Sequence, residues 1–328
     1  MRNIINIESF KVYSGAKKGV KIPVLDRPAH TLELPLTIIN GSNDGPTVLI
    51  TAGTHGTEYV GIAVALRVIR EIDPSKVSGA VFVAPIINIL GYELREKDTF
   101  PIEDDYNGKQ NMGALYPGDP EGSPHRLTLH HIFSKLVSKS QYLIDLHGGD
   151  LYEYLYPCTM IYPTGKKEFD DTLKKMAKAS GIEYCISQPL NKNSKGLTAE
   201  CAKLGIPLLV IEVGSAGIVK EDLIELSYNA VINVLKTIGV LSGRPKTQPE
   251  PKYIKGITVV RSTRGGFFHQ TVETGSLISK GEKLGEIIGL DGQVIEEIHA
   301  PINGLLIQSS CNPSTNSGDG IIRIAEFY

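Results

Sequence analysis

A histidine and a glutamate stand three residues apart in a glycine-rich turn, at His55 and Glu58. A strongly apolar segment at residues 47–52 precedes the turn, and residues 58–72 carry apolar side chains at helical spacing. This pattern predicts a buried strand that ends at the turn and a helix that begins in it. Strand ends are where α/β proteins usually carry functional groups. Since an imidazole and a carboxylate at i and i+3 can converge on one point, the turn predicts two ligands of a metal ion such as Zn²⁺.

Two later residues share this context. His147 ends a predicted strand at residues 142–147, and Glu212 lies near the end of an apolar segment at residues 207–214. His55, Glu58 and His147 would form a two-histidine, one-glutamate set with a fourth position open for water, as in catalytic zinc sites. Glu212 is then the candidate base for the activated water. A chance His-x-x-Glu, a hydrogen-bonded loop histidine and a buried ion pair are the simpler alternatives, and the shared placement at strand ends favours zinc.

Asp145 lies two residues before His147, so both side chains would face the same side of the strand. It could orient the imidazole of a ligand or form a structural ion pair. The histidines outside this set show no ligand spacing.

Apolar segments and helical patterns alternate between residues 47 and 238. This alternation predicts the α/β class, with a sheet covered by helices on both faces. Further strands are expected at residues 80–85, 142–147, 158–162 and 207–214, and further helices at residues 125–138, 166–180, 198–204 and 220–238. Residues 1–45 predict short, partly exposed strands, and residues 91–125 predict a long polar loop.

The domain organisation follows from a change of pattern near residue 244. Residues 1–243 form the predicted catalytic domain, and residues 244–251 form a proline-rich linker. Residues 252–328 predict short strands with glycine turns, a small all-β C-terminal domain.

The overall composition restricts the partners. The 328-residue chain has a formal net charge of −2, which gives no reason to expect nucleic acid or an acidic membrane. No apolar run is long enough to span a membrane, and the first residues lack the core of a signal peptide. Four cysteines without C-x-x-C spacing suit a reducing compartment, so we expect a cytoplasmic protein.

The ordered motifs carry a family resemblance. Gly-Thr-His-Gly-Thr-Glu-Tyr at residues 53–59, Asp-Leu-His-Gly-Gly at 145–149 and Ile-Glu-Val-Gly at 211–214 resemble the succinylglutamate desuccinylase/aspartoacylase family. That family is a branch of the zinc carboxypeptidase fold, and the likeness extends through residues 116–123, 197–207 and 300–304. It implies a carboxypeptidase-like mixed sheet sandwiched by helices, one Zn²⁺ per chain held by His55, Glu58 and His147, and water activation by Glu212. It also implies a small-molecule substrate and an arginine, matched by Arg95, that polarises the scissile carbonyl. A homo-oligomer is compatible with the sequence.

One segment departs from the family pattern. Many members carry an Asn-Arg pair that grips a substrate carboxylate, whereas this chain has Gly113 and Ala114 there. Glycine and alanine cannot form a bidentate clamp. Either Arg95 or Arg126 substitutes, or the substrate offers no carboxylate at that place.

The resulting first hypothesis is a zinc-dependent deacylase of a small N-acyl amino acid or N-acyl amine. A zinc carboxypeptidase-type peptidase is the alternative with the same chemistry, and a non-catalytic ligand-binding or carrier protein is the alternative from another class. The C-terminal segment resembles biotinyl/lipoyl hairpins, but Asn303 and Gly304 occupy the expected turn without a carrier lysine. We therefore expect this region to cap the site.

Overall fold

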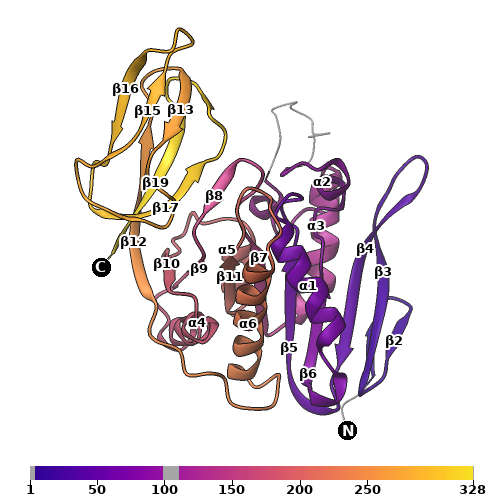
Figure 1. The fold of residues 1–328 in the computed structure, drawn as a ribbon. Coiled ribbons are helices and arrows are strands. Elements are labelled where there is room, and N and C mark those ends of the chain that lie inside the picture. Colours follow the sequence, from indigo (N-terminus) through magenta and orange to yellow (C-terminus); the bar gives the residue numbers. More distant parts are fainter. Residues whose placement is uncertain (1–3, 99–110, 328) are drawn as a thin grey trace.

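Four parallel strands form the centre of a large mixed sheet in the computed structural model, which describes residues 4–98 and 111–327 (Figure 1). Their order is β11–β7–β5–β6. The bounds are β5 (Asn43–Ala52), β6 (Ser78–Ala84), β7 (Tyr142–His147) and β11 (Leu208–Glu212). Most of their side chains are buried on both faces, as in central strands. The register pairs Ala52 with Leu146 and His147 with Glu212, so the predicted site residues follow adjacent strand ends.

Helices cover both faces of this sheet, as the alternation of patterns predicts. The first face carries α1 (Tyr59–Glu71), α4 (Lys167–Ser180) and α6 (Glu221–Thr237), and the second carries α3 (Pro124–Lys135) and α5 (Leu197–Lys203). Each face has its own buried core. Val64 and Val68 of α1 pack in the first core with Ile144, whereas Leu129 of α3 packs in the second with Leu143. No helix in the described part of the chain is long and apolar enough to cross a membrane.

Two long antiparallel strands extend the sheet beyond β6. They are β4 (Thr31–Asn40) and β3 (Ala16–Asp26), with 10 and 11 residues. The prediction of short strands is wrong here and holds only for β1 (Ile5–Ile7) and β2 (Phe10–Val12). The physical reason is tertiary, because β4 pairs with β6 on one side and with β3 on the other. This pairing buries Ile38 and Ile39 completely.

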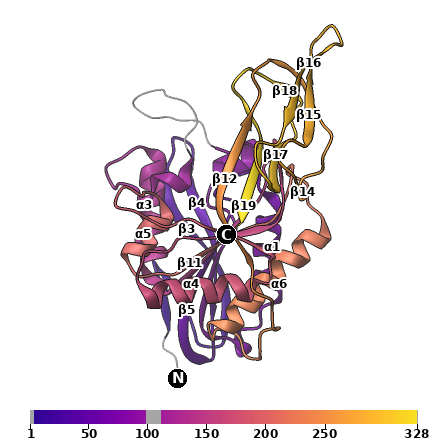
Figure 2. The same ribbon diagram turned by 90° about the vertical axis from the view of Figure 1, so that its left-hand side faces the viewer.

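Strands from both halves of the chain extend the sheet beyond β11. The next strands are β9 (Cys158–Ile161), β10 (Tyr184–Ser187) and β12 (Lys252–Arg261), followed by β19 (Gly320–Phe327), β17 (Gly304–Ser310) and β14 (Leu277–Ile278). The first three residues of β12 pair with β10, and residues 254–261 of β12 pair with β19. The short strand β8 (Glu153–Leu155) pairs with β17. Figure 2 shows the C-terminal strands rising at one end of the molecule. The sheet is therefore continuous between the two predicted domains.

A second, four-stranded sheet completes the C-terminal region. It has the order β16 (Val294–His299), β15 (Lys283–Ile288), β13 (Gly266–Gln270) and β18 (Ser314–Thr315). Leu284 and Ile287 of this sheet pack against Leu306 and Ile324 of the large one. The described residues from 252 to 327 contain strands and no helix, which agrees with the all-β prediction. Asn303 accepts a 2.7 Å hydrogen bond from the backbone N–H of Lys280, so this turn is tied to its neighbour.

The predicted long loop at residues 91–125 is partly wrong. It contains the end of α2 (Ile89–Leu94), the short helix η2 (Met112–Leu115) and the start of α3, whereas residues 99–110 lie outside the described residues. Asn88 accepts a hydrogen bond from the N–H of Gly91, and Asn111 accepts one from the N–H of Gly113. These caps favour short helical turns. Such turns contain too few residues to show the hydrophobic spacing from which a helix is predicted. Two other short helices are η1 (Pro74–Lys76) and η3 (Val137–Lys139).

Candidate metal centre

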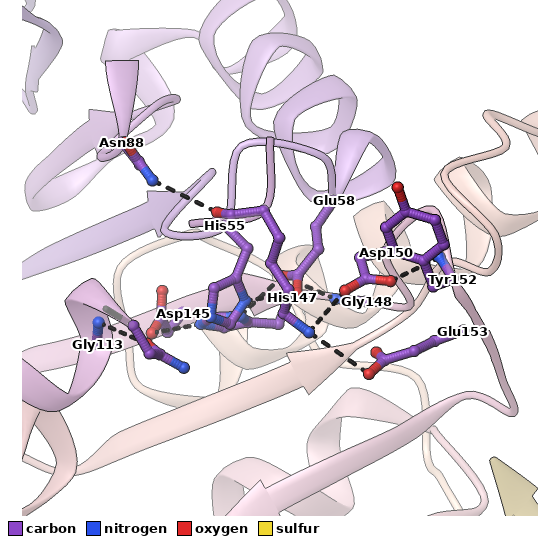
Figure 3. Close-up of polar contacts among 12 residues, drawn as sticks. His55, Glu58, Asn88, Gly113, Asp145, His147, Gly148, Asp150, Tyr152 and Glu153 are labelled. Atoms are coloured by element: carbon purple, nitrogen blue, oxygen red, sulfur yellow. Dashed lines mark hydrogen bonds and ion pairs between the residues drawn. The ribbon is translucent and has the colours of Figure 1, made fainter. Parts of the chain in front are cut away.

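The three predicted ligands meet at the edge of the sheet (Figure 3). His55 lies in the turn after β5, Glu58 precedes the first residue of α1, and His147 is the last residue of β7. The Glu58 carboxylate lies between the rings, with Oε1 2.5 Å from His55 Nδ1 and Oε2 2.8 Å from His147 Nδ1. One candidate donor atom from each residue falls within 4.8 Å of the others. Chain folding thus brings together residues separated by about 90 positions in sequence.

Two glycines shape the turn that carries His55 and Glu58. Gly53 has φ +62°, a left-handed conformation that side chains disfavour. Gly56 packs so closely on α2 that an added Cβ would lie 2.2 Å from the carbonyl carbon of Gly91. The turn therefore requires glycine at both positions.

Opposite charges hold the cluster together. Burial alone would raise the pKa of Glu58, but the two histidines lower it to about 2. Burial would lower the pKa of His147, but the carboxylates of Asp145 and Glu58 raise it well above its usual value. The pKa of His55 is also raised, because Glu58 outweighs the effect of burial. A metal ion that binds here must displace protons from the histidines.

Asp145 contacts the far side of the His147 ring. Its Oδ2 lies 3.0 Å from His147 Nε2, and its Oδ1 accepts a 2.7 Å hydrogen bond from the hydroxyl of Thr51. The Asp145 side chain is buried. A proton on Nε2 that points at Asp145 leaves Nδ1 of His147 free to bind a metal ion. The geometry matches the orienting role that the sequence left open.

The donor set fits a divalent metal ion. Two imidazole nitrogens and one carboxylate suit Zn²⁺, and the same donors accept related transition metals. His55 Nε2 is buried and has no hydrogen-bond partner among the described residues. A ring without a fixed protein partner on that side can adjust to a metal ion.

Glu212 ends β11 directly beside His147 in the strand register. Burial is the main cause that raises the pKa of Glu212 to about 7, with His147 acting against it and Glu58 adding to it. These charges act on Glu212 because the ligand cluster is close. A carboxylate with this pKa can take up and release a proton near neutral pH.

Arg95 lies at the C-terminal end of α2. It has φ +58°, and its side chain is exposed. Within residues 4–98 and 111–327, no hydrogen bond or ion pair connects Arg95 with the three candidate ligands. Its predicted contact with the scissile carbonyl stays a prediction.

The segment that lacks the carboxylate clamp does lie at the site. A Cβ added to Gly113 would lie 3.6 Å from the Thr54 methyl group, next to His55. Figure 3 shows Gly113 on the same side of His147 as Asp145. The missing side chains therefore change the surface beside the candidate ligands. Arg126, the other candidate substitute, lies on α3.

The sequence reasoning missed a second polar cluster. Lys97 Nζ lies 2.7 Å from Asp150 Oδ2 and 3.4 Å from Glu153 Oε1, and the Asp150 side chain is buried. The sequence did offer one sign of this cluster, because Asp150 lies three residues after His147 and directly after two glycines. Lys97 gave no signal, because it lies in a segment without a periodic pattern.

The fold and the site define the class as an α/β protein with a three-residue candidate metal centre at its strand ends. A family model described as the succinylglutamate desuccinylase/aspartoacylase catalytic domain matches residues 44–238. That match covers more than half of the chain, and the chain belongs to this family. The resemblance carried by the sequence motifs is therefore confirmed.

Individual relatives match nearly the whole chain. N-alpha-acetyl-L-2,4-diaminobutyric acid deacetylase from Halomonas elongata is 25% identical over 322 residues, covering 95% of this chain and 92% of the relative. The product-bound ectoine utilization protein EutE (DoeB) from Ruegeria pomeroyi has a TM-score of 0.86 at 22% identity, with 99% of each chain covered. A succinylglutamate desuccinylase/aspartoacylase from Rhodobacter sphaeroides has a TM-score of 0.82 at 23% identity, covering 95% of this chain and 96% of that one. The two solved structures show that this chain shares their fold.

Proposed function

We propose that the protein is a zinc-dependent deacylase that hydrolyses the amide bond of a small N-acyl amino acid or N-acyl amine. The observation that carries this proposal is the cluster of His55, Glu58 and His147 beside Glu212, in a chain of the desuccinylase/aspartoacylase family. The relative from Halomonas elongata, named as a deacetylase of an acetylated diamino acid, supports this substrate class. We also propose that residues 244–251 link a catalytic domain to a β-rich C-terminal domain, and that the fold is related to that of the zinc carboxypeptidases.

The residues divide the reaction between them. His55, Glu58 and His147 would hold Zn²⁺, which when bound polarises the acyl carbonyl and lowers the pKa of water. Glu212 takes one proton from the attacking water as its oxygen bonds to the carbonyl carbon. The same carboxyl group then gives this proton to the amide nitrogen as the C–N bond breaks. The products are a carboxylic acid and an amine. Asp145 keeps His147 in one tautomer throughout.

A hydrolysis screen tests the proposal. Metal-replete protein is incubated with N-acyl amino acids, N-acyl diamines and blocked dipeptides, and the released acid is identified by mass spectrometry. We expect release from N-acyl amino acids or amines, loss of turnover after chelation, and recovery with Zn²⁺. Preferential cleavage of the dipeptides would instead support the peptidase. A metal content well below one per chain with no hydrolysis of any amide would support a non-catalytic binding protein.

We also propose a cytoplasmic location. All four cysteines are free, and three of them are buried, which suits a reducing compartment. Fractionation of the cells that produce the protein tests this location.

A further inference from the structure

The backbone of Lys97 is attached to the turn that carries two candidate metal ligands. The N–H of Gly56 donates a 3.0 Å hydrogen bond to the carbonyl oxygen of Lys97. A Cβ added to Gly56 would lie 2.6 Å from the carbonyl oxygen of Glu96. Because the two segments touch at their backbones, Lys97 has a fixed position relative to His55 and Glu58.

The side chain of Lys97 is held by two carboxylates. Its Nζ lies 2.7 Å from Asp150 and 3.4 Å from Glu153, and 31% of the side chain is exposed. Asp150 is itself fixed, since its Oδ1 accepts a 2.7 Å hydrogen bond from the N–H of Tyr152. An ammonium group has three N–H donors, so two carboxylate partners leave one donor for another acceptor. Figure 3 shows Asp150 and Glu153 across His147 from Asp145.

The C-terminal region holds the segment that carries these carboxylates. Glu153 begins β8 and pairs with Ser310 of β17. Cys311 donates from its N–H to the carbonyl oxygen of Tyr152 at 3.0 Å and from its Sγ to that of Leu151 at 3.1 Å. The C-terminal strands thus set the position of Asp150 and Glu153, which in turn set that of Lys97.

Lys97 stays charged and acts on the candidate metal centre. Burial would lower its pKa, but Glu153 and Asp150 raise it above the usual value, with a contribution from Glu58. Its charge also partly opposes the rise in the pKa of His55 that Glu58 causes. Lys97 is therefore a permanent cation close to the ligands, whereas Arg95 lies exposed at the end of α2.

We propose that Lys97, positioned by Asp150 and Glu153, donates a hydrogen bond to the acyl oxygen of the substrate. This donor stabilises the negative charge that grows on that oxygen while water adds to the carbonyl carbon. The inference rests on the proposed deacylase function and assigns the cation of that site to Lys97 in place of Arg95. It also gives the C-terminal region a role in catalysis, because that region positions the carboxylates that hold Lys97.

Substitutions at Lys97 test this assignment with the substrate that the hydrolysis screen identifies. We expect Lys97→Met to lower kcat by about 10²–10³-fold, the effect of removing one donor to a developing oxyanion, with a much smaller change in KM. Lys97→Arg keeps a cation there and should recover part of kcat. Metal content, measured by elemental analysis, should stay at the wild-type value, because Lys97 is not a ligand.

Lys283→Met is the matched control, since Lys283 also lies between two carboxylates, 2.7 Å from Glu286 and 2.8 Å from Glu297, on the C-terminal strand β15. Lys97→Met leaves Asp150 buried without its cation, which can impair folding. The double variant Lys97→Met/Asp150→Asn removes that charge as well, so it keeps the test valid if the single variant is unstable. The thermal unfolding midpoint of each variant shows whether that variant is folded under the assay conditions.

Three outcomes would overturn the assignment. The first is a folded Lys97 variant with wild-type kcat and a lower thermal midpoint, which would show a purely structural ion pair. The second is a larger loss of kcat in Arg95→Met than in Lys97→Met. The third is a wild-type protein that hydrolyses no acyl amide, and this outcome alone also rejects the proposed function.

Discussion

Asp145 is the residue whose replacement tests the candidate metal centre most directly. It does not belong to the ligand set, yet its Oδ2 lies 3.0 Å from Nε2 of His147 while its Oδ1 accepts from Thr51. Asparagine has nearly the same shape and can still accept the Thr51 hydrogen bond through its oxygen. Its NH₂ group then faces His147 Nε2. Asp145→Asn therefore keeps the shape of the side chain, but it removes the negative charge and turns the acceptor facing His147 into a donor.

The consequence follows from the tautomers of imidazole. An NH₂ donor facing Nε2 favours the form of His147 with its proton on Nδ1, the nitrogen 2.8 Å from Glu58. That proton occupies the lone pair that would bind the metal ion. Replacing such a partner of a metal ligand weakens metal binding by roughly 10–100-fold, or about 1.4–2.7 kcal/mol. We expect this loss of Zn²⁺ affinity in Asp145→Asn.

The assay is competition for Zn²⁺ between the protein and a chromogenic chelator at constant pH. Thr51→Val is the matched control, because it removes the hydroxyl that holds Oδ1 and leaves the charge of Asp145 in place. Its Zn²⁺ affinity should fall much less than that of Asp145→Asn. Unchanged affinity in a folded Asp145→Asn protein would refute the orienting role and question His147 as a ligand.

Three further predictions concern the base, the protons and the packing of α1. Glu212→Gln should keep the metal content and lower kcat by about 10²–10⁴-fold, measured by steady-state kinetics. Wild-type kcat in this variant would exclude Glu212 as the base. In the wild-type protein, protonation of Glu212 should reduce turnover at acid pH. Because the pKa values of His55 and His147 are raised, Zn²⁺ affinity should increase with pH by about tenfold per unit for each displaced proton. Calorimetry in buffers of different ionisation enthalpy measures these protons, and finding none released would contradict the charge state. Gly61→Ala should destabilise the fold by about 1–3 kcal/mol in urea unfolding, since its Cβ would lie 2.9 Å from the carbonyl oxygen of Leu146. Helix propensity alone would instead stabilise the fold by about 1 kcal/mol. That result would contradict the prediction and show that α1 can shift to make room for the methyl group.

The local sequence determined the elements around the site. The apolar segment before His55 predicts β5, and the spacing of Val60, Val64 and Val68 predicts α1, which begins one residue after Glu58. These signals are strong because burial imposes a period on each element. The same reasoning placed His147 and Glu212 at strand ends, and parallel pairing brings both to one edge. The candidate ligand set was therefore predictable from patterns of a few residues each.

The tertiary structure alone decided the lengths and partners of the outer strands. β3 and β4 reach 11 and 10 residues because each pairs along its length with a neighbour, which their own composition does not specify. The sheet likewise continues from β10 into β12, although the proline-rich sequence between residues 244 and 251 suggests a separation. Pairing between distant strands depends on register and shared burial, and neither is visible in a local window.

The sequence by itself thus determined the class of the fold, the family and the residues able to bind a metal ion. Only the tertiary structure placed Lys97 beside Asp150 and Glu153, because three segments must pack before these charges meet. A lysine in a non-periodic segment carries no local sign of its partners, since an ion pair depends on distance in space. A strand end, in contrast, can be predicted from the run of apolar residues that precedes it. The candidate ligands could therefore be predicted from the sequence, whereas the position of the lysine near them required the fold.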